Sequence, residues 1–302
     1  MPTPTELGGL MVPAVTNFDD RGESLDVDAF SANIRAYIKA GVSGIVVAGS
    51  SGEAPLLTDD ERAVLIEAAR GLVPTDRWLI AGVGAESTRL TVERARDAAH
   101  CGADAVLVVA PHYFPQTSVP DALLAHYQRV ADESPIPVLL YTIPQYMHFV
   151  LPPAVVSRLA LHANVIGMKD SGGDATVFSA YLASQSPEFA VLTGHGGTFV
   201  SAVTAGARGG ILGVALITPT LALAAFEAAR SRRTADAAAL QAQLLPLARD
   251  VGGTLGPAGI KAALDAAGLR GGRVRPPLLP LDEARRRKVA ALVDAALAVV
   301  AA

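Results

Sequence analysis

The sequence is poor in the residues that usually bind metals or form disulfides. Among 302 residues there is one cysteine, Cys101, which cannot form an intrachain disulfide or build a cysteine zinc site. The six histidines are scattered, and no two of them have metal-ligand spacing. This pattern disfavours a metal-dependent aldolase or hydrolase. We therefore expect no metal and no other cofactor.

Long hydrophobic runs and excess positive charge are also missing. No uncharged stretch reaches about 18 apolar residues, the length of a membrane-spanning helix, and the first ten residues, MPTPTELGGL, lack the basic start and apolar core of a signal peptide. The net charge is -4 and the pI is near 5.9, so no basic surface invites nucleic acid. We expect a cytoplasmic protein with a small-molecule substrate, bound to neither membrane nor nucleic acid.

What the chain does contain is a regular alternation of short apolar runs and helical patterns. The apolar runs predict strands at 10–15, 44–48, 78–83, 105–110, 137–142, 165–169, 190–194 and 209–213. The intervening patterns predict helices at 26–40, 58–72, 87–100, 120–133, 152–162, 174–184, 197–206 and 219–231. Eight such units over roughly 220 residues favour a closed parallel (β/α)8 TIM barrel within the α/β class.

The rest of the chain, residues 233–302, is rich in alanine and leucine and interrupted by a Gly/Pro-rich break at 271–280. Its composition predicts a helical extension packed on the barrel. We therefore divide the chain into a catalytic barrel, residues 1–232, and a C-terminal helical extension, residues 233–302.

Lysine is scarce, and one lysine has an unusual position. The 25 basic residues comprise 21 arginines and four lysines. Lys39, Lys261 and Lys288 lie in helical patterns and are interpreted as solvated. Lys169 instead ends the sixth apolar run, at the strand end where barrels handle ligands. An amine held against apolar walls has a lowered pKa and can attack a carbonyl to form a Schiff base, whereas the alternative is a lysine that reaches from the strand end into water.

Hydroxyl and phenol groups follow several of the other predicted strands. The turn after the second strand, Gly49-Ser50-Ser51-Gly52-Glu53, offers backbone N–H groups and hydroxyls to a carboxylate. Tyr113 follows the fourth strand and Tyr141 ends the fifth, directly before the lysine strand. The pair Gly82 and Gly84 lacks the third glycine of a dinucleotide fingerprint and is interpreted as a tight turn. A single tyrosine is more often a packing residue, but Tyr141 beside Lys169 favours catalysis.

Three of these segments together resemble a known family. Gly49–Glu53, Tyr141-Thr142-Ile143-Pro144 and Gly167-Met168-Lys169-Asp170 are similar, in order, to the signatures of the dihydrodipicolinate synthase / N-acetylneuraminate lyase superfamily of Schiff-base aldolases. Within it, residues 86–88, 134–138 and 168–174 most resemble the mitochondrial type of 4-hydroxy-2-oxoglutarate aldolase. The resemblance implies a barrel with a C-terminal helical extension and a homotetramer built from tight dimers, or a homodimer.

The same resemblance implies a role for each matching residue. Lys169 would form the imine with pyruvate, and Tyr141 would move protons at the substrate oxygen, fed by Ser50 and by Tyr113 across a dimer interface. Ser50 and Ser51 would hold the pyruvate carboxylate, and Ser171 would face the second substrate. The substrate-binding residues expected in this chain are Ser50, Ser51, Ser171, Gly194 and Ile211.

One position departs from the family pattern. Dihydrodipicolinate synthases usually carry an arginine two residues after the proline of the tyrosine motif, and this chain has Tyr146 there. Tyr146 also differs from the small Asn-Thr-Gly turn of the mitochondrial-type aldolases, so a narrower and more aromatic pocket is expected. The second substrate, glyoxylate or a larger aldehyde, stays open at this point.

Three functions remain in competition. The leading hypothesis is a pyruvate-dependent class I aldolase, a carbon–carbon lyase that cleaves 4-hydroxy-2-oxoglutarate or a similar 2-oxo acid to pyruvate and an aldehyde such as glyoxylate. The second keeps the lysine imine in a dihydrodipicolinate synthase-like reaction, or in a sugar-acid lyase or dehydratase. The third is a non-catalytic 2-oxo acid binding protein on the same scaffold, because a fold does not determine a function.

Overall fold

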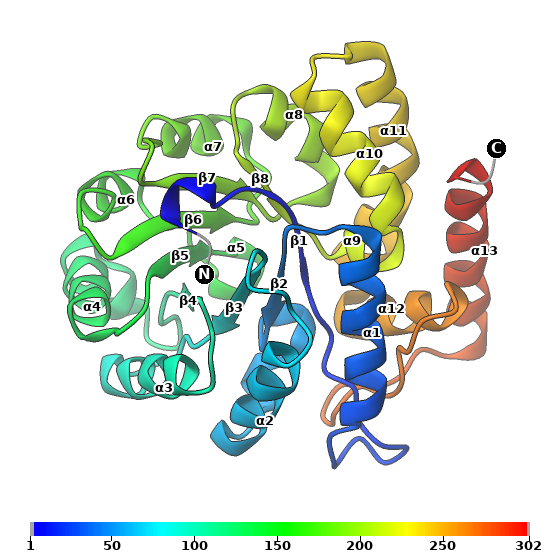
Figure 1. Cartoon of the computed structure of the whole chain (residues 1–302), viewed down its shortest axis with the longest axis horizontal. Coiled ribbons are helices and arrows are strands. Elements are labelled where there is room, and N and C mark those ends of the chain that lie inside the picture. The colour runs from blue at the N-terminus through cyan, green and yellow to red at the C-terminus, as the bar shows by residue number, and fades with distance from the viewer. Residues whose placement is uncertain (1–2, 301–302) are drawn as a thin grey trace.

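The computed structural model describes residues 3–300 and contains a closed barrel of eight parallel strands in sequential order (Figure 1). This confirms the fold class. The strands are β1 (Gly9–Pro13), β2 (Gly44–Val47), β3 (Trp78–Gly82), β4 (Ala105–Val109), β5 (Val138–Thr142), β6 (Val165–Asp170), β7 (Ala190–Thr193) and β8 (Gly209–Ile211). Each lies within about two residues of its predicted position, because a strand buried on both faces is a continuous apolar run in the sequence.

A helix follows each strand and covers the outside of the barrel, as the alternation predicted. These helices are α1 (Val27–Ala40), α2 (Asp59–Arg70), α3 (Thr88–His100), α4 (Pro120–Glu133), α6 (Pro153–Leu159), α7 (Ala175–Leu182), α8 (Phe199–Thr204) and α10 (Pro219–Arg230). A capping box begins α2, with Thr58 and Glu61 each accepting a backbone N–H of the other. Two single-turn helices, α5 (Pro144–Met147) and α9 (Val214–Ile217), were not predicted.

The C-terminal segment is helical and bends back onto the barrel. It comprises α11 (Thr234–Pro246), the π-helical turn η6 (Leu247–Gly253), α12 (Thr254–Ala266) and α13 (Glu283–Val300). Residues 267–282, which include the Gly/Pro-rich break, separate α12 from α13. Helix α12 packs against α9 and against the 3-10 turn η2 (Ser50–Gly52), while α13 lies outside it (Figure 1). The extension therefore contacts the carboxyl side of the barrel.

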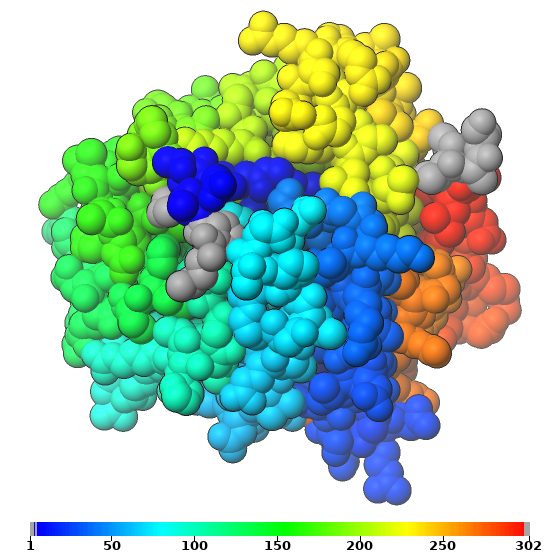
Figure 2. All heavy atoms as spheres, viewed as in Figure 1, coloured from blue at the N-terminus to red at the C-terminus, as the bar shows by residue number. Residues whose placement is uncertain are grey.

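Two apolar clusters make up the core. The larger fills the space between strands and helices, and the smaller fills the barrel interior. Leu7 is 1 % exposed and belongs to the interior cluster, so the segment before β1 closes the barrel at the amino ends of the strands. Figure 2 shows this segment, in dark blue, lying across the face in view. Ligands are therefore expected to bind at the carboxyl ends of the strands.

One lysine lies where the sequence analysis did not expect it. Lys39 and Lys288 are exposed, as expected, but Lys261 on α12 is 1 % exposed and pairs with the buried Glu53. The interpretation of Lys261 as solvated is therefore wrong. A helical pattern does not reveal a charged residue on the buried face when its partner comes from a distant part of the chain. Among residues 3–300, no helix combines the length and apolarity needed to cross a bilayer.

Candidate active site

A β-bulge sets the register between the two strands that carry the central residues. Val138 of β5 pairs with Val165 of β6, but the next residue, Leu139, pairs with Gly167. One extra residue in β6 therefore shifts all later pairs, and Tyr141 lies opposite Lys169. Regular pairing would have placed Lys169 opposite Thr142 and Met168 opposite Tyr141. The bulge was not predicted, although Gly167 inside the strand is a signal for one, because an isolated glycine in a strand often marks a bulge.

Lys169 is buried. Its side chain leaves the end of β6 and only 5 % of the residue is exposed. The Nζ atom lies 4.4 Å from the centroid of the Tyr141 ring, a distance at which an ammonium and an aromatic face attract each other. The alternative of a lysine extending into water is therefore wrong.

Tyr141 connects the lysine to the turn after β2. The phenol is 4 % exposed and belongs to the barrel interior cluster. Its hydroxyl lies 3.3 Å from Oγ of Ser50, within hydrogen-bond distance. An amine, a phenol and a serine hydroxyl from three different strand ends thus form one contiguous group.

The predicted substrate-binding residues surround this group. A Cβ atom at Gly194 would lie 2.5 Å from Cε of Lys169 and 2.1 Å from Oγ of Ser171, so only glycine leaves room for both side chains there. Ile211 is fully buried in the interior cluster at the end of β8. Ser51 lies near the end of β8, since its Oγ lies 3.8 Å from a Cβ built at Gly213.

Tyr113 is not part of the buried group. It lies on the loop between β4 and α4, is 75 % exposed and packs edge-on against Phe114, with ring centroids 5.0 Å apart. The loop is held by Glu86, whose Oε2 accepts the backbone N–H groups of His112 and Tyr113, both at 2.9 Å. Glu86 was noted in the sequence only for a resemblance, and this anchoring was not predicted.

Asp170, the residue after the lysine, is a buried carboxyl group. It is 2 % exposed, and its Oδ1 accepts the backbone N–H of Gly172 at 3.0 Å. Burial raises the pKa of Asp170 to about 6, and the nearby Asp174 adds to the rise. The native state therefore binds a proton more tightly than the unfolded chain does.

This raised pKa predicts a pH-dependent gain in stability for Asp170→Asn. A pKa of about 6 in the native state against an ordinary 3.8 means that stability is greatest below pH 4 and falls as the pH rises through 6. At pH 8 the loss amounts to about 3 kcal/mol. The neutral amide keeps an acceptor for Gly172 and avoids this loss. We expect the thermal midpoint of Asp170→Asn to exceed that of the wild type at pH 8, with a smaller difference at pH 5.

The control for this prediction is Asp294→Asn, which changes an exposed carboxylate on α13. It should leave the midpoint unchanged at both pH values. A difference between Asp170→Asn and wild type that does not grow with pH would contradict the prediction.

The geometry defines the class of site. Among the residues that the structure describes, no group of three or more His, Cys, Asp or Glu side chains could hold a metal ion. The buried group itself offers an amine that can attack a carbonyl, a phenol that can move a proton and a hydroxyl that can relay it. At the carboxyl end of a (β/α)8 barrel, this set is typical of a Schiff-base lyase.

Comparison with known proteins agrees with this class. The profile of the dihydrodipicolinate synthetase family matches residues 6–296, and the chain belongs to that family. It is thus an enzyme of the carbon–carbon lyase class that forms Schiff bases with pyruvate. The assignment rests on nearly the whole chain.

Individual relatives carry the name 4-hydroxy-tetrahydrodipicolinate synthase. One from Stenotrophomonas maltophilia is 36 % identical over 276 residues, 91 % of this chain and 92 % of that protein. One from Exiguobacterium is 31 % identical over 286 residues, 95 % of this chain and 97 % of that protein. These names differ from the mitochondrial-type aldolase that the sequence analysis favoured.

Solved structures give the same family. The dihydrodipicolinate synthase DapA-2 of Bacillus anthracis superposes with a TM-score of 0.91 at 28 % identity, covering 96 % of this chain and 98 % of that chain. YagE, a prophage protein of the dihydrodipicolinic acid synthase family from E. coli K12 solved in complex with pyruvate, superposes with a TM-score of 0.89 at 29 % identity, covering 97 % and 99 %.

Proposed function

We propose that the protein is a pyruvate-dependent class I aldolase that cleaves a 4-hydroxy-2-oxo acid, such as 4-hydroxy-2-oxoglutarate, to pyruvate and an aldehyde. The observation that carries the proposal is the buried amine of Lys169, 4.4 Å from the ring of Tyr141, whose hydroxyl lies 3.3 Å from Ser50. Family membership supports the imine chemistry.

In this proposal Lys169 attacks the keto carbon in its unprotonated form. The carbonyl oxygen leaves as water, and Tyr141 supplies the proton that this departure needs. The resulting iminium accepts the electron pair of the breaking C–C bond as an enamine, while the 4-hydroxyl loses its proton and becomes the aldehyde. Protonation of the enamine and hydrolysis of the imine then release pyruvate and restore the lysine.

The other expected site residues have supporting roles in the proposal. Ser50 and Ser51, with the backbone N–H groups of their turn, hold the pyruvate carboxylate. Ser171 faces the second substrate, and Gly194 leaves the space in which the lysine chain moves. Tyr113 contributes its hydroxyl across a dimer interface, which agrees with its 75 % exposure in the single chain.

Tyr146 is the observation that favours cleavage of a 2-oxo acid over the synthase reaction. It is 48 % exposed, and its hydroxyl lies 3.9 Å from a Cβ built at Gly256 of α12. Burial raises the pKa of Tyr146, and the neighbouring Tyr141 adds to the rise, so the phenol stays neutral. A neutral phenol cannot replace the bidentate charge pairing of the arginine that dihydrodipicolinate synthases usually carry here, whereas the mitochondrial-type aldolases, whose substrate also has a distal carboxylate, have a small uncharged turn at this position.

The second candidate function is a dihydrodipicolinate synthase-like condensation of pyruvate with an amino-aldehyde, and the relatives named 4-hydroxy-tetrahydrodipicolinate synthase support it. The identity of 36 % over most of the chain favours it. In both candidates the imine on Lys169 is the same, and only the partner of the enamine differs.

A substrate panel separates the candidates. We expect the purified protein to release pyruvate from 4-hydroxy-2-oxoglutarate, measured with a coupled lactate dehydrogenase assay. Condensation of pyruvate with aspartate semialdehyde should be at least about tenfold slower in kcat/KM, since the arginine on which the synthases usually rely is Tyr146 here and one lost charge pairing costs more than about 1.4 kcal/mol. Faster condensation than cleavage would overturn the leading candidate in favour of the second.

The remaining expectations are part of the same proposal. The chain acts as a homodimer or homotetramer in the cytoplasm, with residues 1–232 as the catalytic barrel and 233–302 as a helical extension. Cross-linking and light scattering would measure the assembly. The exposed Tyr113 and Phe114, at 75 % and 59 %, mark the edge at which a second chain would meet the site.

A further inference from the structure

The turn that carries Ser50 and Ser51 begins and ends in unfavourable backbone conformations. Ala48 has φ of 52° and Glu53 has φ of 57°, both in the left-handed region and neither a glycine. Each such residue costs about 1 kcal/mol or more. The conformation of this turn persists only if contacts with the surrounding structure hold it.

The barrel holds one part of the turn. The hydroxyl of Thr16, after β1, donates to the carbonyl of Gly52 at 2.7 Å, and both residues are buried. A Cβ at Gly52 would lie 2.9 Å from the carbonyl oxygen of Ala14. The turn therefore lies against the backbone that follows β1.

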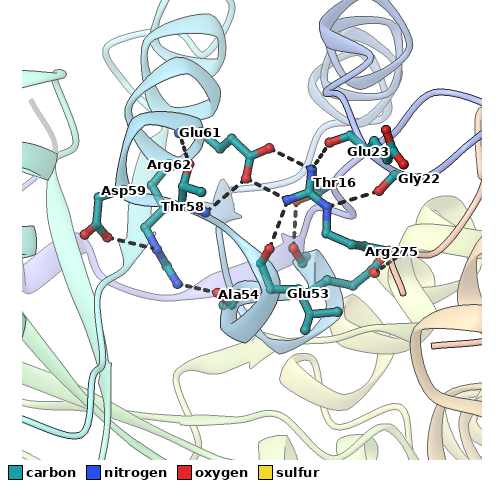
Figure 3. A network of polar contacts seen from close by, with 12 residues as sticks. Thr16, Gly22, Glu23, Glu53, Ala54, Thr58, Asp59, Glu61, Arg62 and Arg275 are labelled. Atoms are coloured by element: carbon teal, nitrogen blue, oxygen red, sulfur yellow. Dashed lines mark hydrogen bonds and ion pairs between the residues drawn. The ribbon is translucent and has the colours of Figure 1, made fainter. Parts of the chain in front are cut away.

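The C-terminal extension holds the other part through the side chain of Glu53. Its Oε1 lies 2.6 Å from Nζ of Lys261 on α12, and its Oε2 accepts the backbone N–H of Arg275 at 2.8 Å. Figure 3 shows Glu53 below Arg275, whose guanidinium lies between Glu61 and the 22–23 turn. Arg275 binds Glu61 through two hydrogen bonds of 2.6 and 2.7 Å.

The Lys261–Glu53 pair is fully removed from water. The two side chains are 1 % and 0 % exposed. Burial lowers the pKa of Lys261, and the Glu53 carboxylate opposes this shift. Lys261 also donates to the carbonyl of Arg273, and its Nζ lies 4.5 Å from the Phe18 ring centroid. Because desolvation offsets most of the attraction in such a pair, its net contribution to overall stability is small.

We propose that Lys261 and Glu53 are positioning residues: the C-terminal extension, through this pair, holds the Ser50–Ser51 turn in the conformation that binds the substrate carboxylate. The proposal rests on the proposed role of that turn in pyruvate binding. The carboxylate is bound in the same way before and during the chemistry, so loosening the turn weakens substrate binding more than it slows the step at Lys169, which the turn affects only through the contact of Ser50 with Tyr141. The extension is thus part of the substrate site.

The test uses the full chain and the double variant Glu53→Gln/Lys261→Met, which removes both charges and keeps similar volumes. The readout is the rate of borohydride-trapped pyruvate adduct on Lys169 as a function of pyruvate concentration. We expect the half-saturating pyruvate concentration to rise about tenfold, the effect of losing roughly 1.4 kcal/mol of binding. The maximal trapping rate should change less than about threefold.

Two further variants complete the experiment. Glu53→Gln alone leaves the buried ammonium of Lys261 without its counter-charge and should raise the half-saturating concentration by at least as large a factor. The control Glu283→Gln/Arg287→Met removes an exposed ion pair of 3.1 Å on α13 and should change neither quantity.

The outcomes are distinct. An unchanged half-saturating concentration in a folded double variant overturns the proposal. So does a maximal trapping rate that falls by the same factor as the pyruvate affinity while the thermal midpoint also falls, because that result indicates a general structural role. If the double variant does not fold, Glu53→Gln alone decides in the same way. Absence of any adduct in the wild type contradicts the proposed function, on which the proposal rests.

Discussion

Replacement of Lys169 by alanine is expected to lower turnover of the 2-oxo acid by roughly 10⁵-fold or more, because it removes the amine that bonds to the keto carbon. The variant should fold, since the lost amine makes one contact with the Tyr141 ring and the barrel register around it is set by backbone pairing. Pyruvate release in a coupled assay and the far-UV circular dichroism spectrum measure the two expectations.

The control for this variant is Lys39→Ala, which removes an exposed amine on α1. It should retain full activity. Turnover by Lys169→Ala within tenfold of the wild type, at a native spectrum, would show that the reaction does not pass through an imine on this residue.

Replacement of Tyr141 by phenylalanine is expected to lower turnover by roughly 10²- to 10⁴-fold, the usual contribution of a positioned acid–base group. The ring and its contact with the Lys169 amine remain, so the variant should still be labelled on Lys169 by borohydride and pyruvate, at a reduced rate. If Tyr141→Phe is still labelled on Lys169 but has lost turnover, the phenol acts in proton transfer and is not needed for the attack of the lysine on pyruvate.

The hydroxyl of Ser50 gives a second readout for the same prediction. Because Ser50 and Tyr141 are within 3.3 Å and act on one proton path, Ser50→Ala in the Tyr141→Phe background should have a much smaller effect than in the wild type. Fully additive losses would contradict a shared path. We expect both single variants to keep the wild-type thermal midpoint within a few degrees.

Most of the fold could be predicted from the sequence because buried parallel strands and amphipathic helices have distinct hydrophobic patterns. The short helices α5 and α9 were missed because four residues are too few for a helical period. The β6 bulge was not predicted either: Gly167 indicates an irregularity within the strand, but the resulting register follows from how the two strands pair. It determines that Lys169 lies opposite Tyr141.

Lys169, Tyr141 and Ser50 could be picked out from the sequence because each lies at or just after the end of a predicted strand. The residues that hold these side chains in place could not be picked out in this way. Glu53 was noted only as part of a turn, and Lys261 was interpreted as solvated, although the two form a buried pair. Such a pair depends on the docking of α12 against the turn after β2, and neither segment alone contains that information.

The most direct test of the account is reduction with borohydride in the presence of pyruvate, followed by peptide mass mapping. The account predicts one pyruvate-derived adduct, on Lys169, and none on Lys39, Lys261 or Lys288. An adduct on another lysine, or no adduct on a folded protein, would contradict the claim that the buried amine at the end of β6 is the nucleophile.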